Sequence, residues 1–273
     1  MDISGNALVV GGAGGIGKAC ALLLSKEGAS KVLVADLAIH VARDTIAECV
    51  SVARNKDFEG HAVLVDVTSE DSVKRLFSEA ISMFGRIDYV VNCAGIGAQE
   101  ATDIVSLSIV DFQRFLNVNA TGMFLVTREA SIMMRAQQSQ PISPSVPGRG
   151  TTRGAIVNLG SASSLVATAG VLPYTTSKHA ALGLTKNSAL DNASYGVRVN
   201  CVCPSWTDTP MVREAMEGVE GLADFIKGAV PIGRIAKPEE VADVVIFLCS
   251  PRSSYMIGCG VIVDGGATLT ALR

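Results

Sequence analysis

Short runs of apolar, often β-branched residues alternate along the chain with longer segments in which apolar residues recur at helical spacing. The first pattern predicts buried strands and the second predicts amphipathic helices. The runs that predict strands are Asn6–Val10, Lys31–Ala35, His61–Val65, Asp88–Asn92, Ala155–Leu159, Val197–Cys203 and Val261–Val263. The clearest helical segments are Ile16–Glu27, Ser69–Phe84, Tyr174–Ala193 and Glu239–Ser250.

The order of these elements, strand and helix in turn, indicates an α/β fold. The strand runs are apolar on both faces, as expected for strands that helices cover on either side. We therefore predict a doubly wound, mostly parallel sheet of seven strands with helices on both faces. No linker or internal repeat divides residues 1–273, so a single domain is expected.

Two segments stand outside this alternation. Gln137–Arg153 contains three prolines, two glycines and several serines, which is typical of a flexible surface loop. Such a loop is usually a tolerated insertion, and a partner-binding or subunit-contact role is the alternative. Residues 205–230 are predicted to form a substrate lid, because Met211–Lys227 carries apolar residues for an inner side. Ordinary helix packing explains that pattern equally well.

The turn after the first predicted strand is rich in glycine and opens the first predicted helix. Backbone N–H groups and a helix N-terminus at this position can hold a pyrophosphate. An ordinary tight turn is the alternative for such a motif. We expect the phosphates of a dinucleotide beside Gly11, Gly14, Gly15, Ile16 and Gly17.

Asp36 ends the second predicted strand, roughly 20 residues beyond these glycines, where a carboxylate accepts hydrogen bonds from the adenosine ribose. Its charge would also repel a 2′-phosphate, and neither Gly14 nor Leu37 is basic, so NAD is expected rather than NADP. Leu37 is expected beside the cofactor. Arg43 is the nearest basic candidate for a 2′-phosphate, with a solvated helix residue as the alternative.

The third and fourth predicted strands end in further candidates for the cofactor. Asp66, followed by Val67, is expected to face the adenine, although capping a helix or turn is an equal alternative. Asn92, Ala94 and Gly95 close the fourth strand, where small residues let the backbone approach a ligand closely. Ligands of such sheets bind beyond the carboxyl ends of the strands.

Tyr174 and Lys178 stand four residues apart on a predicted helix, so their side chains share one face. A phenol is a weak base at neutral pH, but an adjacent ammonium stabilises the phenolate and allows proton exchange. Ser161 follows the strand Ala155–Leu159, where its hydroxyl could hold a substrate oxygen. Asn119, in a predicted helical segment, could anchor a water that relays protons from Lys178.

Each of these residues has a structural alternative. Tyr–Lys pairs at this spacing are common on helix surfaces, and Ser161, Ser163 or Ser164 could cap or turn the chain. His179 follows Lys178 and points about 100° around the helix from it. No histidine competes with Tyr174 as the acid/base, and the placement of these residues beside a dinucleotide motif favours catalysis.

Composition excludes several classes of function. The net charge of −3 gives no basic excess for nucleic acid or an anionic membrane, and no apolar run is long enough to span a bilayer. The N-terminus resembles no targeting segment, so the cytoplasm is expected. Seven scattered cysteines lack the paired spacing of a metal site and indicate a reducing compartment. Cys201 and Cys203 are expected on opposite faces of a strand.

Taken together, these residues resemble the short-chain dehydrogenase/reductase family, from about Gly5 to Ala267. The resemblance implies a single-domain Rossmann fold and a catalytic tetrad formed by Asn119, Ser161, Tyr174 and Lys178. It also implies cofactor contacts for Tyr174 and Lys178. Further contacts are implied for Pro204, Thr207 and Thr209, which stand in a segment similar to the family's segment beside the nicotinamide. Homotetramers and homodimers are common in the family, so such an assembly is implied.

The expected function is NAD-dependent interconversion of a secondary alcohol and a ketone. The substrate is expected to be a hydrophobic small molecule, such as a natural-product alcohol of secondary metabolism or a steroid-like alcohol. An NADPH-dependent carbonyl reductase is one alternative. A non-catalytic dinucleotide-binding scaffold is another, and the complete tetrad argues against it.

Overall fold

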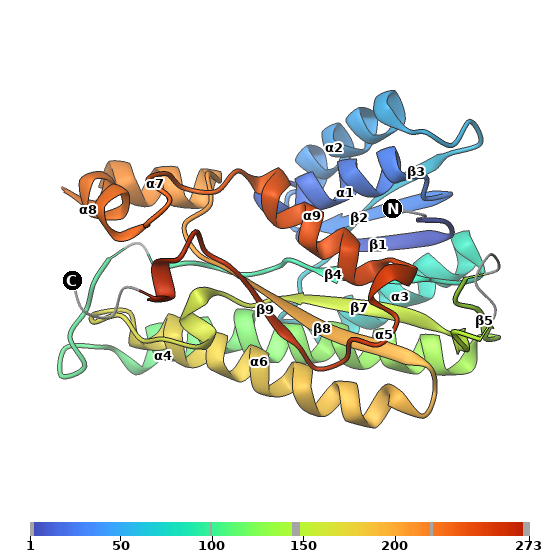
Figure 1. The fold of residues 1–273 in the computed structure, drawn as a ribbon. Helices are drawn as coiled ribbons and strands as arrows, with labels where there is room; N and C mark the ends of the chain where they lie inside the picture. Colours follow the sequence, from blue (N-terminus) through green and yellow to red (C-terminus); the bar gives the residue numbers. More distant parts are fainter. Residues whose placement is uncertain (1–2, 99, 144–147, 219–220, 270–273) are drawn as a thin grey trace.

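Seven strands form one sheet in the order β3-β2-β1-β4-β7-β8-β9 (Figure 1). The computed structural model describes residues 3–98, 100–143, 148–218 and 221–269. The strands are β1 (Asn6–Val10), β2 (Lys31–Asp36), β3 (Glu59–Leu64), β4 (Tyr89–Asn92), β7 (Gly154–Leu159), β8 (Val197–Pro204) and β9 (Gly260–Val263). All six pairings are parallel, so the predicted doubly wound α/β fold is confirmed.

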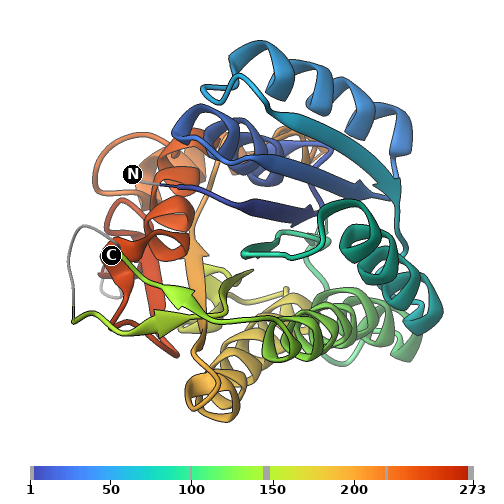
Figure 2. The ribbon, with the colours of Figure 1, turned by 90° about the vertical axis from the view of Figure 1, so that its right-hand side faces the viewer.

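Helices cover both faces of this sheet (Figures 1 and 2). One face carries α1 (Gly15–Glu27), α2 (Ile39–Val52) and α9 (Pro238–Cys249); the other carries α3 (Glu70–Phe84), α4 (Ile109–Leu116), α5 (Met123–Ala136) and α6 (Leu172–Ala193). Successive residues of β1 serve the two layers in turn: Ala7 and Val9 pack in the first, Leu8 and Val10 in the second. This alternation explains why the strand sequences are apolar on both faces.

Short elements complete the fold. They are a π-helix η1 (Asn117–Gly122), the 3₁₀ turns η2 (Ala162–Ser164), η3 (Pro251–Ser253) and η4 (Ala267–Leu269), the two-residue strands β5 (Gln140–Pro141) and β6 (Thr151–Thr152), and the helices α7 (Pro210–Gly218) and α8 (Leu222–Ala229). Helices α7 and α8 stand beyond the carboxyl ends of the strands (Figure 1). They occupy the predicted lid segment, of which residues 219–220 lie outside the described part; the lid's mobility stays a prediction.

The predicted surface loop Gln137–Arg153 carries more regular structure than its composition suggests. Strands β5 and β6 pair antiparallel within it, whereas residues 144–147 lie outside the described part. The Gln137 amide donates to the Ile87 carbonyl oxygen at 2.9 Å and accepts from the Ile87 N–H at 3.2 Å. Arg153 Nε donates to the Gln137 carbonyl oxygen at 2.9 Å. The Arg153 N–H also donates to the Gly196 carbonyl oxygen at 2.8 Å. Both ends of the segment are therefore bonded to the rest of the protein, which proline and glycine content alone does not reveal.

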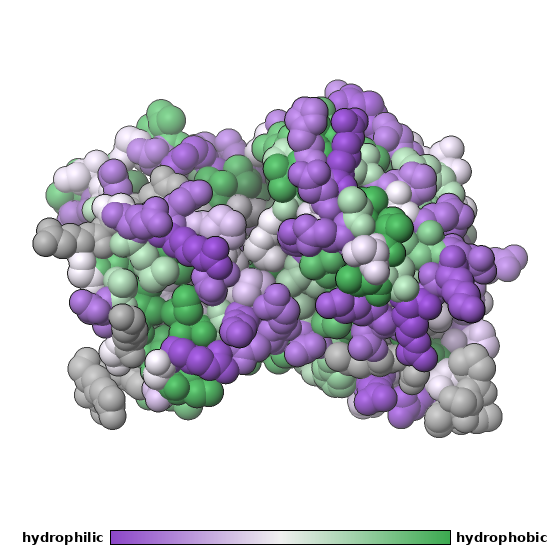
Figure 3. All heavy atoms as spheres, turned by 90° about the horizontal axis from the view of Figure 1, so that it is seen from above, coloured by the Kyte–Doolittle hydropathy of each residue, from purple (hydrophilic) through white to green (hydrophobic). Residues whose placement is uncertain are grey.

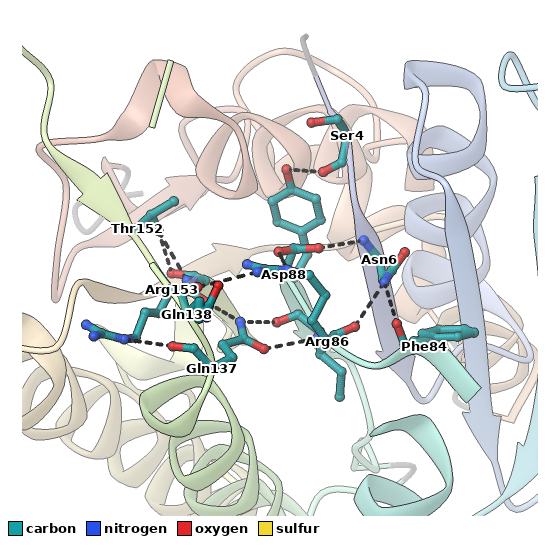
Figure 4. Close-up of polar contacts among 12 residues, drawn as sticks. Ser4, Asn6, Phe84, Arg86, Asp88, Gln137, Gln138, Thr152 and Arg153 are labelled. Atoms are coloured by element: carbon teal, nitrogen blue, oxygen red, sulfur yellow. Dashed lines mark hydrogen bonds and ion pairs between the residues drawn. The ribbon is translucent and has the colours of Figure 1, made fainter. Parts of the chain in front are cut away.

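Asp88 organises the edge of the sheet at which β1 and β4 begin (Figure 4). One carboxylate oxygen accepts from the backbone N–H of Asn6 at 2.9 Å, and the other accepts from Arg86 Nε at 2.7 Å. The Asn6 amide donates in turn to the Phe84 and Arg86 carbonyl oxygens. These bonds satisfy backbone groups where two central strands start.

Arg198 is a buried cation that donates to backbone carbonyl oxygens at and just after the end of α9, and to the Ser253 hydroxyl. Its guanidinium donates to the carbonyl oxygens of Leu248, Cys249, Ser250 and Ser253, at distances from 2.9 to 3.3 Å. The C-terminus of a helix carries partial negative charge, so it stabilises a cation there. Burial lowers the pKa of Arg198, and in the described part of the chain no carboxylate pairs with it. The side chain thus joins the start of β8 to α9.

We predict that Arg198→Met lowers the free energy of unfolding by about 3 kcal/mol, because several buried carbonyl oxygens lose a charged donor. Arg198→Lys recovers only part of the loss, since an ammonium does not reproduce the planar fork of donors. Urea unfolding of each variant measures the effect. Arg149, whose exposed side chain donates to the Pro251 carbonyl oxygen, offers the control: Arg149→Met leaves the midpoint unchanged. Equal midpoints for Arg198→Met and the control contradict this role.

Candidate active site

A cavity of about 540 Å³ opens beyond the carboxyl ends of the strands. The surface is hollowed on this side, between the α7–α8 lobe and the rest of the molecule (Figure 3). Most of the residues singled out from the sequence line the cavity: Gly11, Gly14, Gly15, Ile16, Gly17, Asp36, Leu37, Asp66, Val67, Ala94, Gly95, Ser161, Tyr174, Lys178, Pro204, Thr207 and Thr209. Asn92 and Asn119 do not line it.

The glycine-rich turn between β1 and α1 is held in one shape by two glycines. Gly11 has a φ of +78°, and a Cβ atom on it would lie 2.5 Å from the backbone nitrogen of Ala94. A Cβ atom on Gly17 would lie 2.1 Å from the Gly11 carbonyl oxygen. At Gly14, by contrast, no atom lies within 4 Å of the Cβ position. Protein atoms therefore pack closely against the turn at Gly11 and Gly17, whereas the space at Gly14 is open to a ligand.

Asp36 ties the end of β2 to this turn. One carboxylate oxygen accepts from the Ala13 N–H and the other from the Ala38 N–H, both at 3.0 Å. The carboxylate still borders the cavity, so its remaining lone pairs can accept from ligand hydroxyls. Among the described lining residues, Lys178 is the only Lys or Arg. Arg43 does not line the cavity.

Asp66 forms a turn and also borders the cavity, and its contact with adenine stays a prediction. Its carboxylate accepts from the Thr68 N–H at 2.9 Å and from the Thr68 hydroxyl at 2.7 Å, as in a turn. It also lines the cavity together with Val67. The residue that caps α3 is Ser69, whose hydroxyl accepts from the Ser72 N–H.

Asn92 lies beneath the cavity and not in its described wall, so its predicted position beside the cofactor stays a prediction. The side chain is 1% exposed, and its amide nitrogen donates to the Met123 carbonyl oxygen at 3.4 Å and to the Asn158 side chain at 3.5 Å. It points between β4, β7 and α5, because alternate residues of a strand face opposite sides of the sheet. Asn92 therefore links strands, while Ala94 and Gly95 reach the cavity.

Tyr174 and Lys178 lie on the first turns of α6 and both reach the cavity. Lys178 is 6% exposed, and its ammonium donates to the Leu159 carbonyl oxygen at 3.0 Å. The Lys178 Nζ atom lies 5.7 Å from the centroid of the Tyr174 ring, and the Phe115 ring packs edge-on against that ring. In the described part of the chain, no carboxylate lies within ion-pair distance of Lys178. The ammonium therefore carries an unneutralised charge near the Tyr174 ring, in the wall of the same cavity.

Ser161 follows β7 and combines turn formation with access to the cavity. Its hydroxyl oxygen accepts from the Ser163 N–H at 3.1 Å, and its own N–H donates to the Ser164 hydroxyl at 3.1 Å. These bonds confirm that the serines shape the turn. Within the described residues, the Ser161 O–H donates to no protein acceptor, so it can donate to a ligand in the cavity.

Asn119 lies in the π-helix η1 between α4 and α5, where the sequence predicts a plain helical segment. Its side chain accepts from the Ile96 N–H at 2.8 Å and donates to the Ile96 carbonyl oxygen at 3.0 Å and to the Ser177 hydroxyl at 3.1 Å. A Cβ atom on Gly95 would lie 3.1 Å from the Asn119 oxygen and 3.7 Å from Lys178 Nζ. Asn119 therefore fixes the loop after β4 just behind Lys178.

Several residues of the cavity wall were not named individually as site residues, although Ser205, Pro210, Met211 and Val212 lie in the predicted lid segment 205–230. They are Ala13, Val41, Val65, Thr68, Cys93, Ile96, Val118, Leu159, Gly160, Ser205, Pro210, Met211 and Val212. Many lie directly beside the end of a strand, and this position is the sequence feature that could have identified them as cavity residues. Their apolar side chains otherwise look like ordinary core residues.

The expectation that Cys201 and Cys203 face opposite sides of a strand is wrong. Their sulfur atoms lie 3.8 Å apart, because residues two apart in a strand share a face. Within the described residues, no cluster of three His, Cys, Asp or Glu side chains could hold a metal ion. No helix among those residues is long and apolar enough to cross a membrane.

Comparison with known proteins finds relatives that match almost the whole chain. A family model described as enoyl-(acyl carrier protein) reductase matches residues 11–268. The short-chain dehydrogenase fogB of Aspergillus ruber is 61% identical and covers 100% of both chains. The mitochondrial borneol dehydrogenase of Lavandula x intermedia is 34% identical over 96% of this chain and 90% of its own. The crystal structure of levodione reductase matches with a TM-score of 0.87 and 29% identity, covering 97% of this chain and 98% of that one.

The surroundings of Gly17 and Gly14 predict different effects of the same substitution. Gly17→Ala forces a Cβ atom against the Gly11 carbonyl oxygen, so the free energy of unfolding falls by about 2 kcal/mol despite the better helix propensity of alanine. Gly14→Ala meets no atom and leaves it within about 0.5 kcal/mol of the wild type. Urea unfolding of both variants checks this contrast. Equal losses would show that the turn is not held as described.

Proposed function

The chain belongs to the short-chain dehydrogenase/reductase family, and we propose that it is an NAD-dependent dehydrogenase that interconverts a secondary alcohol and a ketone on an apolar small molecule. As a member of this family, it is an NAD(P)-dependent oxidoreductase that acts on CH–OH groups. The observation that carries the finer proposal is the position of Ser161, Tyr174 and Lys178 in a cavity that also contains the glycine-rich turn.

The shape of the turn supports a dinucleotide against the start of α1. The open space at Gly14 and the N-terminus of α1 fit a pyrophosphate, which backbone N–H groups and a helix dipole stabilise. Asp36 fits the hydroxyls of the adenosine ribose. Its negative charge favours NAD over NADP, since the described wall offers no Lys or Arg there to neutralise a 2′-phosphate. In this proposal, Pro204, Thr207 and Thr209 border the nicotinamide end.

The proposed chemistry divides the work among four side chains. A bound nicotinamide dinucleotide supplies the hydride acceptor for oxidation and the hydride donor for reduction. The Ser161 hydroxyl donates a hydrogen bond to the substrate oxygen, and Tyr174 removes the alcohol proton or returns it to the ketone. The Lys178 ammonium stabilises the Tyr174 phenolate and passes the proton toward solvent. Asn119 holds the loop behind Lys178 and is the candidate anchor for a water in that relay.

The wall around Tyr174 supports an apolar substrate. Ile96, Val118, Met211 and Val212 contribute aliphatic or thioether surface, and Met211 adapts readily to different shapes. Met211 lies at the start of α7, in the proposed lid, and its sulfur packs on Gly97. The lavender relative is named for borneol, a cyclic secondary alcohol. We therefore propose a natural-product or steroid-like alcohol of secondary metabolism as the substrate.

Cytoplasmic location and a homodimeric or homotetrameric assembly are further parts of the proposal. Large exposed apolar side chains are the candidate contacts of this assembly, because an apolar surface patch often marks an interface between proteins. They include Tyr255, which is fully exposed, and Leu190, Val110 and Ile109, each more than two-thirds exposed. The NADPH-dependent carbonyl reductase and the non-catalytic scaffold remain the alternative functions that the experiments below distinguish.

Tyr174→Phe is predicted to lower kcat by at least about 100-fold while leaving NADH binding within about twofold, because it removes the acid/base but not the cofactor contacts. The readout is NADH absorbance with a panel of cyclic secondary alcohols and ketones, together with NADH titration. Tyr195→Phe, beyond the far end of the same helix, is the matched control and retains full activity. Unchanged turnover in Tyr174→Phe contradicts the proposed acid/base, and a wild type that binds NADH without turnover supports the scaffold.

Asp36→Asn is predicted to reduce the preference for NAD over NADP by about tenfold, equivalent to about 1.4 kcal/mol of binding free energy. The substitution preserves shape but removes the charge that repels a 2′-phosphate. Dissociation constants for NADH and NADPH, measured by fluorescence titration, test the change. Asp44→Asn, an exposed charge on α2, controls for net charge and leaves the ratio unaltered. Equal affinity of the wild type for the two cofactors would exclude Asp36 as the selector.

A further inference from the structure

Cys201 and Cys203 form a pair of buried thiols beneath the turn that carries Ser161. Both side chains are fully buried in β8, and their sulfur atoms lie 3.8 Å apart. With Leu182 they form a small apolar cluster separate from the two main layers of the core. The pair therefore lies under the Ser161 turn, where β8 packs against Leu182 of α6.

The backbone of Gly160 packs directly against the two sulfur atoms. A Cβ atom on Gly160 would lie 2.7 Å from Cys201 Sγ and 3.0 Å from Cys203 Sγ. Its φ lies outside the left-handed region, so the restriction is one of space and not of backbone conformation. The Gly160 N–H donates to the Val202 carbonyl oxygen at 2.8 Å, which fixes this approach. The thiols thus support the backbone that immediately precedes Ser161.

Polar contacts extend this support to Ser161 itself. The Ser164 hydroxyl, which accepts from the Ser161 N–H, would lie 2.9 Å from the same Cβ position on Gly160. Hydrogen bonds from the Cys201 thiol, the Ser164 hydroxyl and the Ser161 backbone, together with the Lys178 charge, lower the pKa of Cys203 to about 7 against the effect of burial. The hydrogen bond between the thiols and burial raise the pKa of Cys201. Cys203 therefore contacts the Ser161–Ser164 turn and lies within the electrostatic influence of Lys178.

We propose that Cys201 and Cys203 are positioning residues, which hold the Gly160–Ser161 backbone where the Ser161 hydroxyl reaches the substrate oxygen. The inference rests on the proposed function, in which Ser161 binds that oxygen. A side chain smaller than cysteine leaves a gap under Gly160, and a larger one meets its backbone. Displacing a catalytic group by about 1 Å can cost as much as 100-fold in rate.

The first test compares Cys203→Ala with the conservative Cys203→Ser. Removing the sulfur is expected to lower kcat by roughly tenfold while KM and the NADH dissociation constant stay within twofold, since Ser161 acts mainly on the transition state. Serine keeps a hydrogen-bonding group and is expected to restore kcat to within about threefold of the wild type. Activity is measured with the best cyclic alcohol of the panel. Cys49→Ala, a buried thiol of α2 outside the site, is the control for lost volume and keeps the wild-type kcat.

The second test uses the contact between Gly160 and Cys201. Gly160→Ala in the wild type forces a Cβ atom against both sulfur atoms, and kcat is expected to fall more than tenfold. In a Cys201→Ala background the nearer of the two sulfur atoms is gone, so the added methyl group is expected to cost less than in the wild type. Non-additivity of this kind indicates direct contact. Additive losses would overturn the proposal that sulfur positions this backbone.

Hydrogen exchange separates failure of this inference from failure of the proposed function. In the wild type and Cys49→Ala, the backbone amide of Ser161 is expected to be protected by its bond to Ser164, whereas Cys203→Ala increases exchange in residues 160–164. Unchanged exchange and unchanged kcat in Cys203→Ala overturn the positioning role. A wild type without turnover refutes the proposed function, yet the exchange comparison still decides whether the thiols hold the turn. Melting temperatures confirm that each variant is folded.

Discussion

The active site depends on the burial of one ammonium group, that of Lys178. An ion removed from water needs compensating partners, and this one has the Leu159 carbonyl oxygen at 3.0 Å, at the end of β7. That bond sets the position of α6 relative to β7, and with it the positions of Tyr174 and Ser161. Asn119 and Gly95 close the space behind the ammonium. Within the described residues no carboxylate neutralises it, so in the proposed mechanism its field acts on the phenol and on a substrate oxygen.

The parallel sheet brings these groups together and separates them from the bonds that stabilise the fold. Because every strand runs in the same direction, the glycine-rich turn, Asp36, Gly95 and Ser161 all emerge at one edge. At the opposite edge, Asp88 and Gln137 satisfy the backbone groups where strands begin (Figure 4). Arg198 joins β8 to the end of α9. The catalytic edge can therefore leave backbone and hydroxyl donors free for ligands.

The predictable part of this protein is the part that follows from local rules. Alternation of strands and helices indicated the sheet, and position after a strand end identified Asp36, Gly95 and Ser161 as residues of one edge. The direction of side chains was harder to predict from the sequence. The Asn92 side chain lies beneath the cavity, and Asn119 lies in a π-helix that the spacing of apolar residues does not indicate. The pairing of β5 with β6 inside Gln137–Arg153 and the hydrogen bonds of Arg198 could not be predicted, because they join residues that are distant in sequence. Strand alternation places Cys201 and Cys203 on the same face, so the expectation of opposite faces was wrong.

The most direct test of the account follows the hydrogen that leaves the alcohol carbon. Cyclic secondary alcohols labelled with deuterium at that carbon are incubated with NAD and protein, and the NADH formed is analysed by mass spectrometry. The account predicts deuterated NADH from the wild type and almost none from Lys178→Met, although both proteins bind NADH. Label that is absent from NADH, or equal transfer by Lys178→Met, would contradict the central role of the buried ammonium.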